Sequence, residues 1–283
     1  MERAPLLVSA PDSLQLICSD VWGGIDRARL DVKAPGLNGL IYAHPSGSHR
    51  GGDVYYLTAC SAGLMARMCL ADVAGHGEQV SDFSTWLHNV LRRHMNLPKP
   101  DKILQRVNRL VNAKGVEVMS TAAVFTYYAT NGTLNFGYAG HPHALVYRAD
   151  RAVWEALKAP ASESDSPRNV TFGVIEDVHY DLGSVKLSEG DRFIVYSDGV
   201  TESMSPDHRV FGDEALLKVL SLNARASNRE LGDRIVEALC AHTESAEPSH
   251  DDVTFMLFEV AHLMRGSKTY HFMKNRVRKA LRH

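Results

Sequence analysis

The chain has 283 residues, of which 45% are hydrophobic and 23% charged, a composition typical of a soluble globular protein. Its formal net charge is −2, but residues 261–283 hold seven basic and no acidic residues, leaving 24 basic and 33 acidic residues in 1–260. An acidic body without a basic stripe argues against a nucleic-acid-binding fold. No run of about 18 apolar residues predicts a transmembrane helix.

The four cysteines, Cys18, Cys60, Cys69 and Cys240, have no CxxC spacing. This argues against a zinc ribbon or a redox motif and favours a reducing compartment. The N-terminus contains no convincing signal peptide. We therefore expect a cytoplasmic location.

The first part of the chain predicts strands. Short apolar runs such as residues 14–18 are typical of edge strands. Residues 54–60 and 65–73 predict two longer strands, joined by a turn at 61–63.

From Glu78 the apolar period becomes helical, and Pro98 and Pro100 then interrupt the pattern. The apolar face of this first helix consists of Val80, Phe83, Leu87, Val90 and Leu91. A second helix follows, for which we predict Asp101 at the N-cap and Gly115 at the end. Its apolar face consists of Ile103, Leu104, Val107, Leu110 and Val111.

The clearest hairpin pairs residues 121–130 with 133–139 through the turn Asn131-Gly132. Further strands are predicted at 144–147, 178–187, 192–196 and 252–260, helices at 213–220 and 228–242, and a polar loop at 159–169. This order is not a βαβ alternation. It favours one domain with mainly antiparallel sheets that helices cover.

Four acidic sites share one pattern, in which an aspartate follows an apolar strand or lies in a glycine-rich turn. They are Gly51-Gly52-Asp53, Asp72 in 71–77, Asp198 in 196–199, and Asp251-Asp252 before Val253-Thr254. A turn or a cap explains each one alone. Together they predict a cation site, because converging buried carboxylates need compensating charge. Oxygen ligands select Mg²⁺ or Mn²⁺ over zinc.

These motifs resemble the bacterial metal-dependent Ser/Thr phosphatases of the PP2C-like (PPM) class, in the SpoIIE/RsbU-type branch. The motifs that carry the resemblance, in the family's order over about residues 36–260, are Gly51-Gly52-Asp53, Asp72-Val73-Ala74-Gly75-His76-Gly77, Ala139-Gly140-His141-Pro142, Tyr196-Ser197-Asp198-Gly199-Val200-Thr201-Glu202, Phe211-Gly212-Asp213-Glu214 and Asp251-Asp252-Val253-Thr254. The resemblance implies an α+β fold, a four-layer αββα sandwich of two antiparallel sheets flanked by helix pairs. The phosphatase domain would span residues 1–260 (core about 36–260), before a basic tail at 261–283.

The resemblance also implies an activity. Two Mn²⁺ or Mg²⁺ ions would activate a bridging water or hydroxide, which attacks phosphoserine or phosphothreonine in a protein. The implied metal ligands are the side chains of Asp53, Asp72, Asp198 and Asp251 and the backbone carbonyl of Val73. Asp72 would bridge the ions, and Asp53 would act directly or through water. Asp252 is a rival to Asp251, which we prefer because the family's aspartate precedes an Asp or Asn two residues before the Thr or Ser.

His76 lies between Gly75 and Gly77, just before the helix predicted from Glu78. It is a candidate catalytic residue, as general acid to the leaving oxygen. Gly75 and Gly77 are candidate substrate-binding positions, because backbone donors at a helix start favour anions. A structural turn histidine is the open alternative, because eukaryotic relatives place their histidine two residues after the bridging aspartate and His76 lies four after Asp72.

Two further features lie near these motifs. Gly140-His141-Pro142 predicts a structural turn that supports the site rather than a metal pair with His143, because Pro142 disfavours a regular strand. Arg50 is a candidate for the arginine that grips phosphate in the eukaryotic relatives.

The expected partner is a phosphorylated protein, and an anti-sigma-factor antagonist is one candidate because relatives often act on such proteins. In the tail, Met273, Val277 and Leu281 have helical spacing. The tail is therefore either a solvated extension or a contact for an acidic partner. A non-catalytic phosphatase-fold binding or regulatory module is the alternative function, disfavoured because all four aspartates are present. A zinc esterase or nuclease would need a histidine-rich cluster, which the sequence lacks.

Overall fold

The computed structural model describes residues 13–16, 21–46, 50–60, 63–75, 78–97, 99–115, 118–160, 167–248 and 251–264. The elements are β1 (Ser13–Gln15), β2 (Val21–Asp26), β3 (Ala28–Ala34), β4 (Leu37–His44), β5 (Arg50–Cys60), β6 (Met65–Val73), α1 (Glu78–His94), α2 (Pro100–Lys114), β7 (Ser120–Tyr128), β8 (Thr133–Ala139), β9 (Leu145–Arg148), β10 (Val153–Ala156), β11 (Gly183–Lys186), β12 (Arg192–Tyr196), α3 (Asp198–Thr201), α4 (Gly212–Leu222), α5 (Asn228–Thr243) and β13 (Val253–Val260). None of the helices in these ranges has the length and apolar character needed to cross a membrane.

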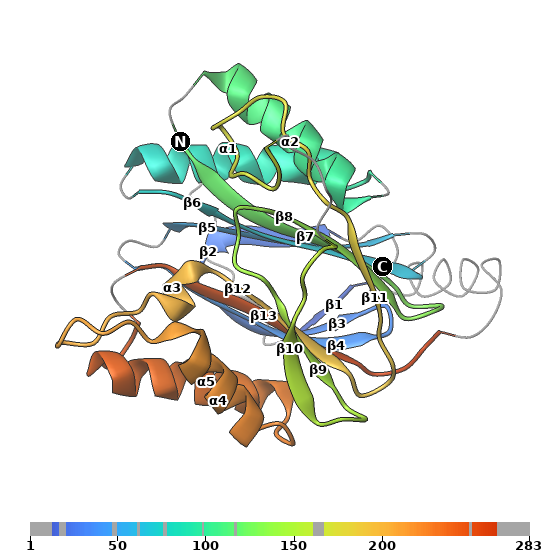
Figure 1. The fold of residues 1–283 in the computed structure, drawn as a ribbon, viewed down its shortest axis with the longest axis vertical. Coiled ribbons are helices and arrows are strands. Elements are labelled where there is room, and N and C mark those ends of the chain that lie inside the picture. The colour runs from blue at the N-terminus through green and yellow to red at the C-terminus, as the bar shows by residue number, and fades with distance from the viewer. Residues whose placement is uncertain are drawn as a thin grey trace, which may run out of the picture.

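Two sheets pack face to face between two helix pairs (Figure 1). The seven-stranded sheet has the order β1-β3-β4-β13-β12-β9-β10, and the six-stranded sheet has the order β11-β8-β7-β6-β5-β2. Helices α1 and α2 cover the outer face of the six-stranded sheet, and α4 and α5 cover that of the seven-stranded sheet. The predicted αββα sandwich is confirmed. One detail differs from the expected antiparallel sheets, because β1 pairs with β3 in parallel.

Both faces of the central strands are buried, which follows from helices covering the outside of each sheet. In β6, Met68 and Leu70 point into the layer between the sheets, while Cys69 and Ala71 point towards α1 and α2. Side chains of a strand alternate between its two faces. An apolar run such as that of β6 therefore serves two cores at once, and the sequence pattern alone does not separate them.

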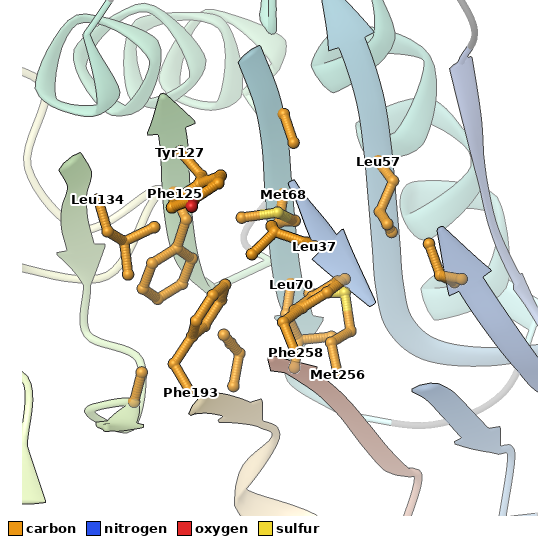
Figure 2. Close-up of a cluster of buried hydrophobic side chains, with 14 of the residues drawn as sticks. Leu37, Leu57, Met68, Leu70, Phe125, Tyr127, Leu134, Phe193, Met256 and Phe258 are labelled. Carbon is orange, nitrogen blue, oxygen red and sulfur yellow. The ribbon is translucent and has the colours of Figure 1, made fainter. Parts of the chain in front are cut away.

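The layer between the sheets is a close-packed aromatic and aliphatic core (Figure 2). Its centre includes Phe193, whose ring centroid lies 6.2 Å from that of Phe125 and 5.2 Å from that of Phe258. Phe125 belongs to the six-stranded sheet and the other two to the seven-stranded sheet. These contacts hold the two sheets in a fixed relation, and so fix where their edges meet.

Most predicted elements are present, with corrections at their ends. The hairpin β7–β8 is confirmed, and Gly132 in its turn has a φ of 67°. Gly115 ends α2 with a φ of 65°, as predicted. The N-cap prediction for α2 was wrong: Lys99 occupies that position, and Asp101 lies in the first turn after Pro100. Proline is favoured in the first turn because a backbone N–H at this position has no acceptor within the helix, so the helix loses no hydrogen bond where proline lacks one.

Other differences come from tertiary pairing. The strand predicted at 178–187 is regular only at β11, because the chain before it forms an isolated bridge between Arg168 and His179. Strand β10 and the short helix α3 were not predicted. The turn at 61–62, residues 161–166 of the predicted loop, and residues 17–18 lie outside the described residues.

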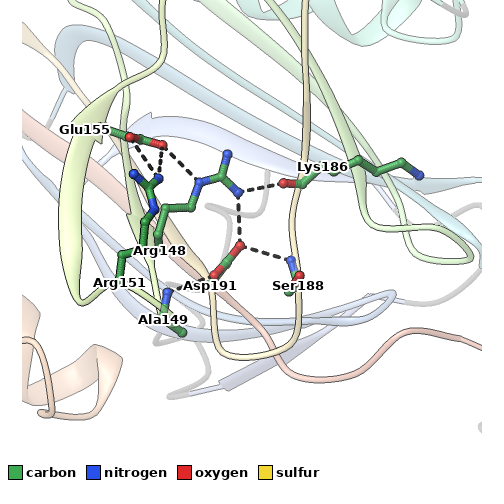
Figure 3. A network of polar contacts seen from close by, with 7 residues as sticks. All are labelled: Arg148, Ala149, Arg151, Glu155, Lys186, Ser188 and Asp191. Carbon is green, nitrogen blue, oxygen red and sulfur yellow. Dashed lines mark hydrogen bonds and ion pairs between the residues drawn. The ribbon is translucent and has the colours of Figure 1, made fainter.

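The sandwich is also fastened by a polar network at the start of β12 (Figure 3). The buried carboxylate of Asp191 accepts hydrogen bonds from the backbone N–H groups of Ala149, at 2.9 Å, and Ser188, at 3.0 Å. Arg148 completes it, with Nη1 3.1 Å from Oδ2 of Asp191 and 2.6 Å from the carbonyl of Lys186. Because Lys186 lies in the edge strand β11, Arg148 of β9 connects the seven-stranded sheet to the edge of the six-stranded sheet.

After β13 the chain continues across this same end of the sandwich. The N–H of Ala261 donates to the carbonyl of Gly36, and the N–H of Met264 donates to the carbonyl of Ala129. Leu263 and Met264 pack against the core between the sheets. Contacts with the sandwich therefore continue past Val260 to Met264, and residues 265–283 of the basic tail lie outside the described residues.

We predict that Arg148→Met lowers the free energy of unfolding by about 1–3 kcal/mol, because the buried Asp191 carboxylate loses a charged donor. Urea denaturation measures this. Arg151→Met is the matched control, because Arg151 contacts Glu155 with both side chains at least 40% exposed, and exposed ion pairs contribute little. Equal losses in the two variants would contradict the role assigned to Arg148.

Candidate metal centre

Two pairs of strands deliver the predicted aspartates to one end of the sandwich. Val54 of β5 pairs with Ala71 of β6 in antiparallel register. Asp53, one residue before Val54, therefore lies opposite Asp72, one residue after Ala71. On the other sheet, the N–H of Ser197, which follows β12, donates to the carbonyl of Thr254 in β13. Asp198 and Asp251 are therefore brought to the same end, from segments that lie far apart in the sequence.

Hydrogen bonds join the two sheets at this place. The hydroxyl of Ser197 donates to Oδ2 of Asp53 at 2.8 Å, and accepts from the N–H of Thr254 at 3.0 Å. Asp53 lies in the six-stranded sheet, whereas Thr254 lies in the seven-stranded one and Ser197 directly follows β12 of that sheet. A single buried hydroxyl thus ties the first acidic site to the strand that leads into Asp198.

Asp53 is the most enclosed of the four aspartates, with 4% of its surface exposed. Its Oδ1 has no hydrogen-bond partner among the described residues. Burial raises the pKa of Asp53 well above its usual value, and the nearby charge of Asp72 raises it further. A buried carboxylate oxygen without a donor is costly unless a cation approaches it.

Asp72 lies where the other carboxylates converge. Burial is the largest cause that raises its pKa, to about 7. The remaining causes are all negative charges, those of Asp198, Asp251, Asp252 and Glu202. Mutual repulsion of this kind shows that the carboxylates share one region of space.

Asp198 and Asp251 show the same effect more weakly. Burial raises the pKa of Asp198, and the charge of Glu202 adds to it. Burial also raises the pKa of Asp251, with additions from Asp198 and Asp252. Glu202 follows Asp198 by four residues, across the short helix α3. Sequence reasoning quoted Glu202 only as part of a motif, although this spacing could have placed it near Asp198.

The two neighbouring aspartates at 251 and 252 have different surroundings. Asp252 is buried and accepts backbone hydrogen bonds on both oxygens: from the N–H of Ser46 at 2.7 Å on Oδ1, and from those of Gly52 and Asp53 on Oδ2. Asp251 is exposed, and its Oδ1 accepts from the N–H of Asp252. Both oxygens of Asp252 are therefore used in hydrogen bonds to the backbone, which include two to β5, whereas the Asp251 side chain is exposed to solvent.

Glycines allow the close approach of these segments. A Cβ at Gly52 would lie 2.7 Å from the carbonyl oxygen of Val73 and 3.5 Å from Oδ1 of Asp72. A Cβ at Gly51 would overlap the Asp252 carboxylate, and one at Gly199 would overlap the Asp252 carbonyl. The backbone of β5 thus passes directly against the two groups of β6 that the sequence analysis assigned to metal binding.

The donor chemistry fits a hard divalent cation. The site offers carboxylate oxygens, a backbone carbonyl and the unpartnered Oδ1 of Asp53, which are the ligand types of Mg²⁺ and Mn²⁺. Within the described ranges, no three His, Cys, Asp or Glu side chains form a ready-made ion-binding cluster. The fit therefore rests on donor type, burial and mutual repulsion.

The described part of the chain includes only some of the other positions singled out in the sequence. His76 and Gly77 lie outside the described residues, as does the side chain of Arg50. Gly75 is exposed and has a φ of 110°. His143 is exposed and packs its ring against Tyr138 rather than near the aspartates, with ring centroids 5.0 Å apart.

Sequence reasoning also quoted Ser197 only as part of a motif and missed its role. Its contact with Asp53 joins positions 144 residues apart, and no local pattern signals it.

The sequence of this chain matches a known family and curated relatives. Residues 65–261 match the family model described as Stage II sporulation protein E (SpoIIE). The chain is 24% identical over 197 residues to phosphoserine phosphatase RsbP of Bacillus subtilis (strain 168), which covers 68% of this chain and 45% of RsbP. The chain spans less than half the length of the curated relatives it matches.

Solved structures show the same fold. The SiaA-PP2C domain of Pseudomonas aeruginosa aligns with a TM-score of 0.66 and 18% identity, covering 78% of this chain and 85% of that domain. RsbX in complex with magnesium aligns with a TM-score of 0.59 and 15% identity, covering 82% of this chain and all 100% of RsbX. Each likeness is one of architecture, and agrees with the two-sheet sandwich described above.

We predict that the ion-free protein loses stability as pH rises from about 4 to about 7. In this window folded Asp72, with a pKa of about 7, keeps a proton that the unfolded chain has released. The Asp72→Asn protein has no carboxylate to deprotonate at this position. Over the same pH range its free energy of unfolding should therefore decrease less than that of the wild type, and the difference should be at least about 1 kcal/mol.

Thermal melts in chelator at pH 5 and pH 8 measure this difference. The exposed Asp177 provides the control variant Asp177→Asn, which should follow the wild type. A wild-type protein that becomes more stable between these pH values, in step with Asp72→Asn, would contradict the prediction.

Proposed function

Because the chain belongs to the SpoIIE family of PP2C-type phosphatases, we propose that it is a metal-dependent phosphatase that hydrolyses phosphoserine or phosphothreonine in a protein. The observation that carries this proposal is the convergence of four aspartates, from four separate segments, at one end of the sandwich. Burial, with the added charges of Asp198 and Asp251, raises the pKa of Asp72 to about 7. An arrangement with this electrostatic cost is expected where cations bind.

We propose that Asp53, Asp72, Asp198 and Asp251, with the backbone carbonyl of Val73, hold two Mn²⁺ or Mg²⁺ ions. Oxygen-only donors support this class of ion, and magnesium is the ion in the related RsbX structure. Bound ions would supply positive charge that lowers the pKa of a water nucleophile and offsets the charge of the phosphoryl group.

The protein's own part in this reaction is to prepare the ligands. Ser197 orients Asp53 through its hydroxyl, and the backbone of Gly52 lies against Asp72 and Val73. Asp252 holds the N–H groups of Gly52 and Asp53 and so fixes the turn at the start of the site. This division of roles supports Asp251, rather than Asp252, as the ligand.

His76 is our candidate for the general acid that protonates the leaving serine or threonine oxygen, with Gly75 and Gly77 as candidate contacts to the phosphoryl group. Their place in the sequence supports this, because they follow Asp72 and precede α1. Backbone N–H groups at the start of a helix favour anions.

The substrate we propose is a phosphorylated regulatory protein, with an anti-sigma-factor antagonist as one candidate. The proposed phosphatase domain comprises residues 1–260, and the tail is a candidate contact for an acidic partner. The N–H of Met264 donates to the carbonyl of Ala129, just after the end of β7. Asp72 pairs with Thr121 near the start of β7, so a partner bound through the tail would approach from the other end of this strand. A cytoplasmic location is consistent with the unpaired thiols of Cys69 and Cys240.

We predict that the purified chain hydrolyses an aryl phosphate with Mn²⁺ and stops when a chelator is added. Asp72→Asn should lower kcat/KM at least 100-fold, because a ligand charge is removed where the ions would lie. Circular dichroism checks that the variant is folded. Normal turnover by a folded Asp72→Asn protein would refute the proposed function.

A second prediction separates Asp251 from Asp252. In chelator, Asp252→Asn should lower the free energy of unfolding by about 1–3 kcal/mol, because backbone donors lose a carboxylate acceptor. Asp251→Asn should leave that stability unchanged or raise it, because one of the mutually repelling charges is removed, yet weaken Mn²⁺ binding and slow hydrolysis. Denaturation in chelator and calorimetric Mn²⁺ titration measure the two effects. The reverse pattern would make Asp252 the ligand.

A further inference from the structure

The Gly140-His141-Pro142 motif turns the chain into the interior directly after β8. Gly140 has a φ of 62°, which favours glycine, and its N–H donates to the carbonyl of Asn169 at 2.7 Å. A Cβ at this position would overlap the Thr171 side chain. As a result the next residue, His141, is buried, with 5% of its surface exposed.

The His141 ring contacts the strand that lies beside Asp72. Its Nδ1 is 2.7 Å from Oγ1 of Thr121. Thr121 in β7 is the partner of Asp72 in the register of β6 and β7. Directly opposed residues of an antiparallel pair point to the same face, with Cβ atoms about 4.5–5.5 Å apart. The hydroxyl that His141 holds therefore belongs to a directly opposed cross-strand neighbour of Asp72.

The imidazole is neutral in this position. Burial lowers the pKa of His141 to about 3, against a smaller opposing effect of the Tyr196 backbone carbonyl. A neutral ring has one donor and one acceptor nitrogen, so it can hold a hydroxyl without adding charge. Tyr196 lies two residues before Asp198, which places the ring between the segments that carry Asp72 and Asp198.

Packing alone does not account for a histidine here. Its Nε2 has no hydrogen-bond partner in the described part of the chain. A buried polar atom in this state is costly, and an apolar side chain would fill the space without that cost. The contact with Thr121 is a hydrogen bond that an apolar side chain could not make.

We propose that His141 is a positioning residue: by holding the Thr121 side chain, which lies directly opposite Asp72 in the register of β6 and β7, it limits the orientations open to the Asp72 carboxylate for ion binding. The inference rests on the proposed function in taking Asp72 as a metal ligand. Groups that orient a ligand in this way typically change metal affinity or activity 10- to 100-fold when they are removed. His141 touches neither substrate nor ion in this role.

The test compares variants of the full chain by calorimetric titration with Mn²⁺. His141→Leu and Thr121→Val should each weaken Mn²⁺ binding about 10- to 100-fold. The double variant should be no weaker than either single one, because both remove the same contact. Thr121→Ser, which keeps the hydroxyl, should retain most of the affinity. His143→Leu is the matched control and should bind as the wild type does.

Wild-type Mn²⁺ affinity in His141→Leu would overturn the inference, as would losses that multiply in the double variant. If His141→Leu does not fold, Thr121→Val decides, because valine has nearly the shape of threonine. Failure of the proposed function looks different: Asp72→Asn would then bind Mn²⁺ as tightly as the wild type. If Asp72→Asn loses binding while both Thr121 and His141 variants keep it, the positioning role alone is wrong.

Discussion

The repulsion among half-buried carboxylates, at the end of the sandwich where the two sheets meet, is the constraint on which the site depends. Burial is the largest cause that raises the pKa of Asp72, and all the other causes are negative charges of nearby carboxylates. Two strands of one sheet and two segments of the other bring these charges together. Such an arrangement is stable as a set of anions only with positive charge supplied from outside the chain.

The opposite end of the same fold shows how a buried carboxylate is accommodated without an ion. Asp191 is as enclosed as Asp53, but it has Arg148 and two backbone N–H donors. Asp53 instead has the hydroxyl of Ser197 on one oxygen and an unpartnered second oxygen. The two ends differ in charge compensation rather than in burial, and this contrast favours a cation at the Asp53 end.

The aromatic core between the sheets makes this site possible. Its packing fixes the distance and register of β5 and β6 against β12 and β13, and this brings the aspartates of the two sheets together. Short polar links then set individual orientations: Asp252 to the β5 backbone, Ser197 to Asp53 and His141 to Thr121. Each link lies at or beside an acidic site, and the first two join positions 199 and 144 residues apart.

The sequence by itself determined most strands and helices after residue 50, the hairpin at Asn131-Gly132 and the four acidic motifs, because each depends on local alternation, turn chemistry or strand ends. It did not give β10 or α3. Tertiary structure decided the rest. It paired β1 in parallel, shortened the strand before Lys186, and gave the neighbours Asp251 and Asp252 opposite surroundings. These outcomes depend on which segments meet across the sandwich, and the contact of Ser197 with Asp53 spans 144 residues. Local patterns contain no information about such pairings.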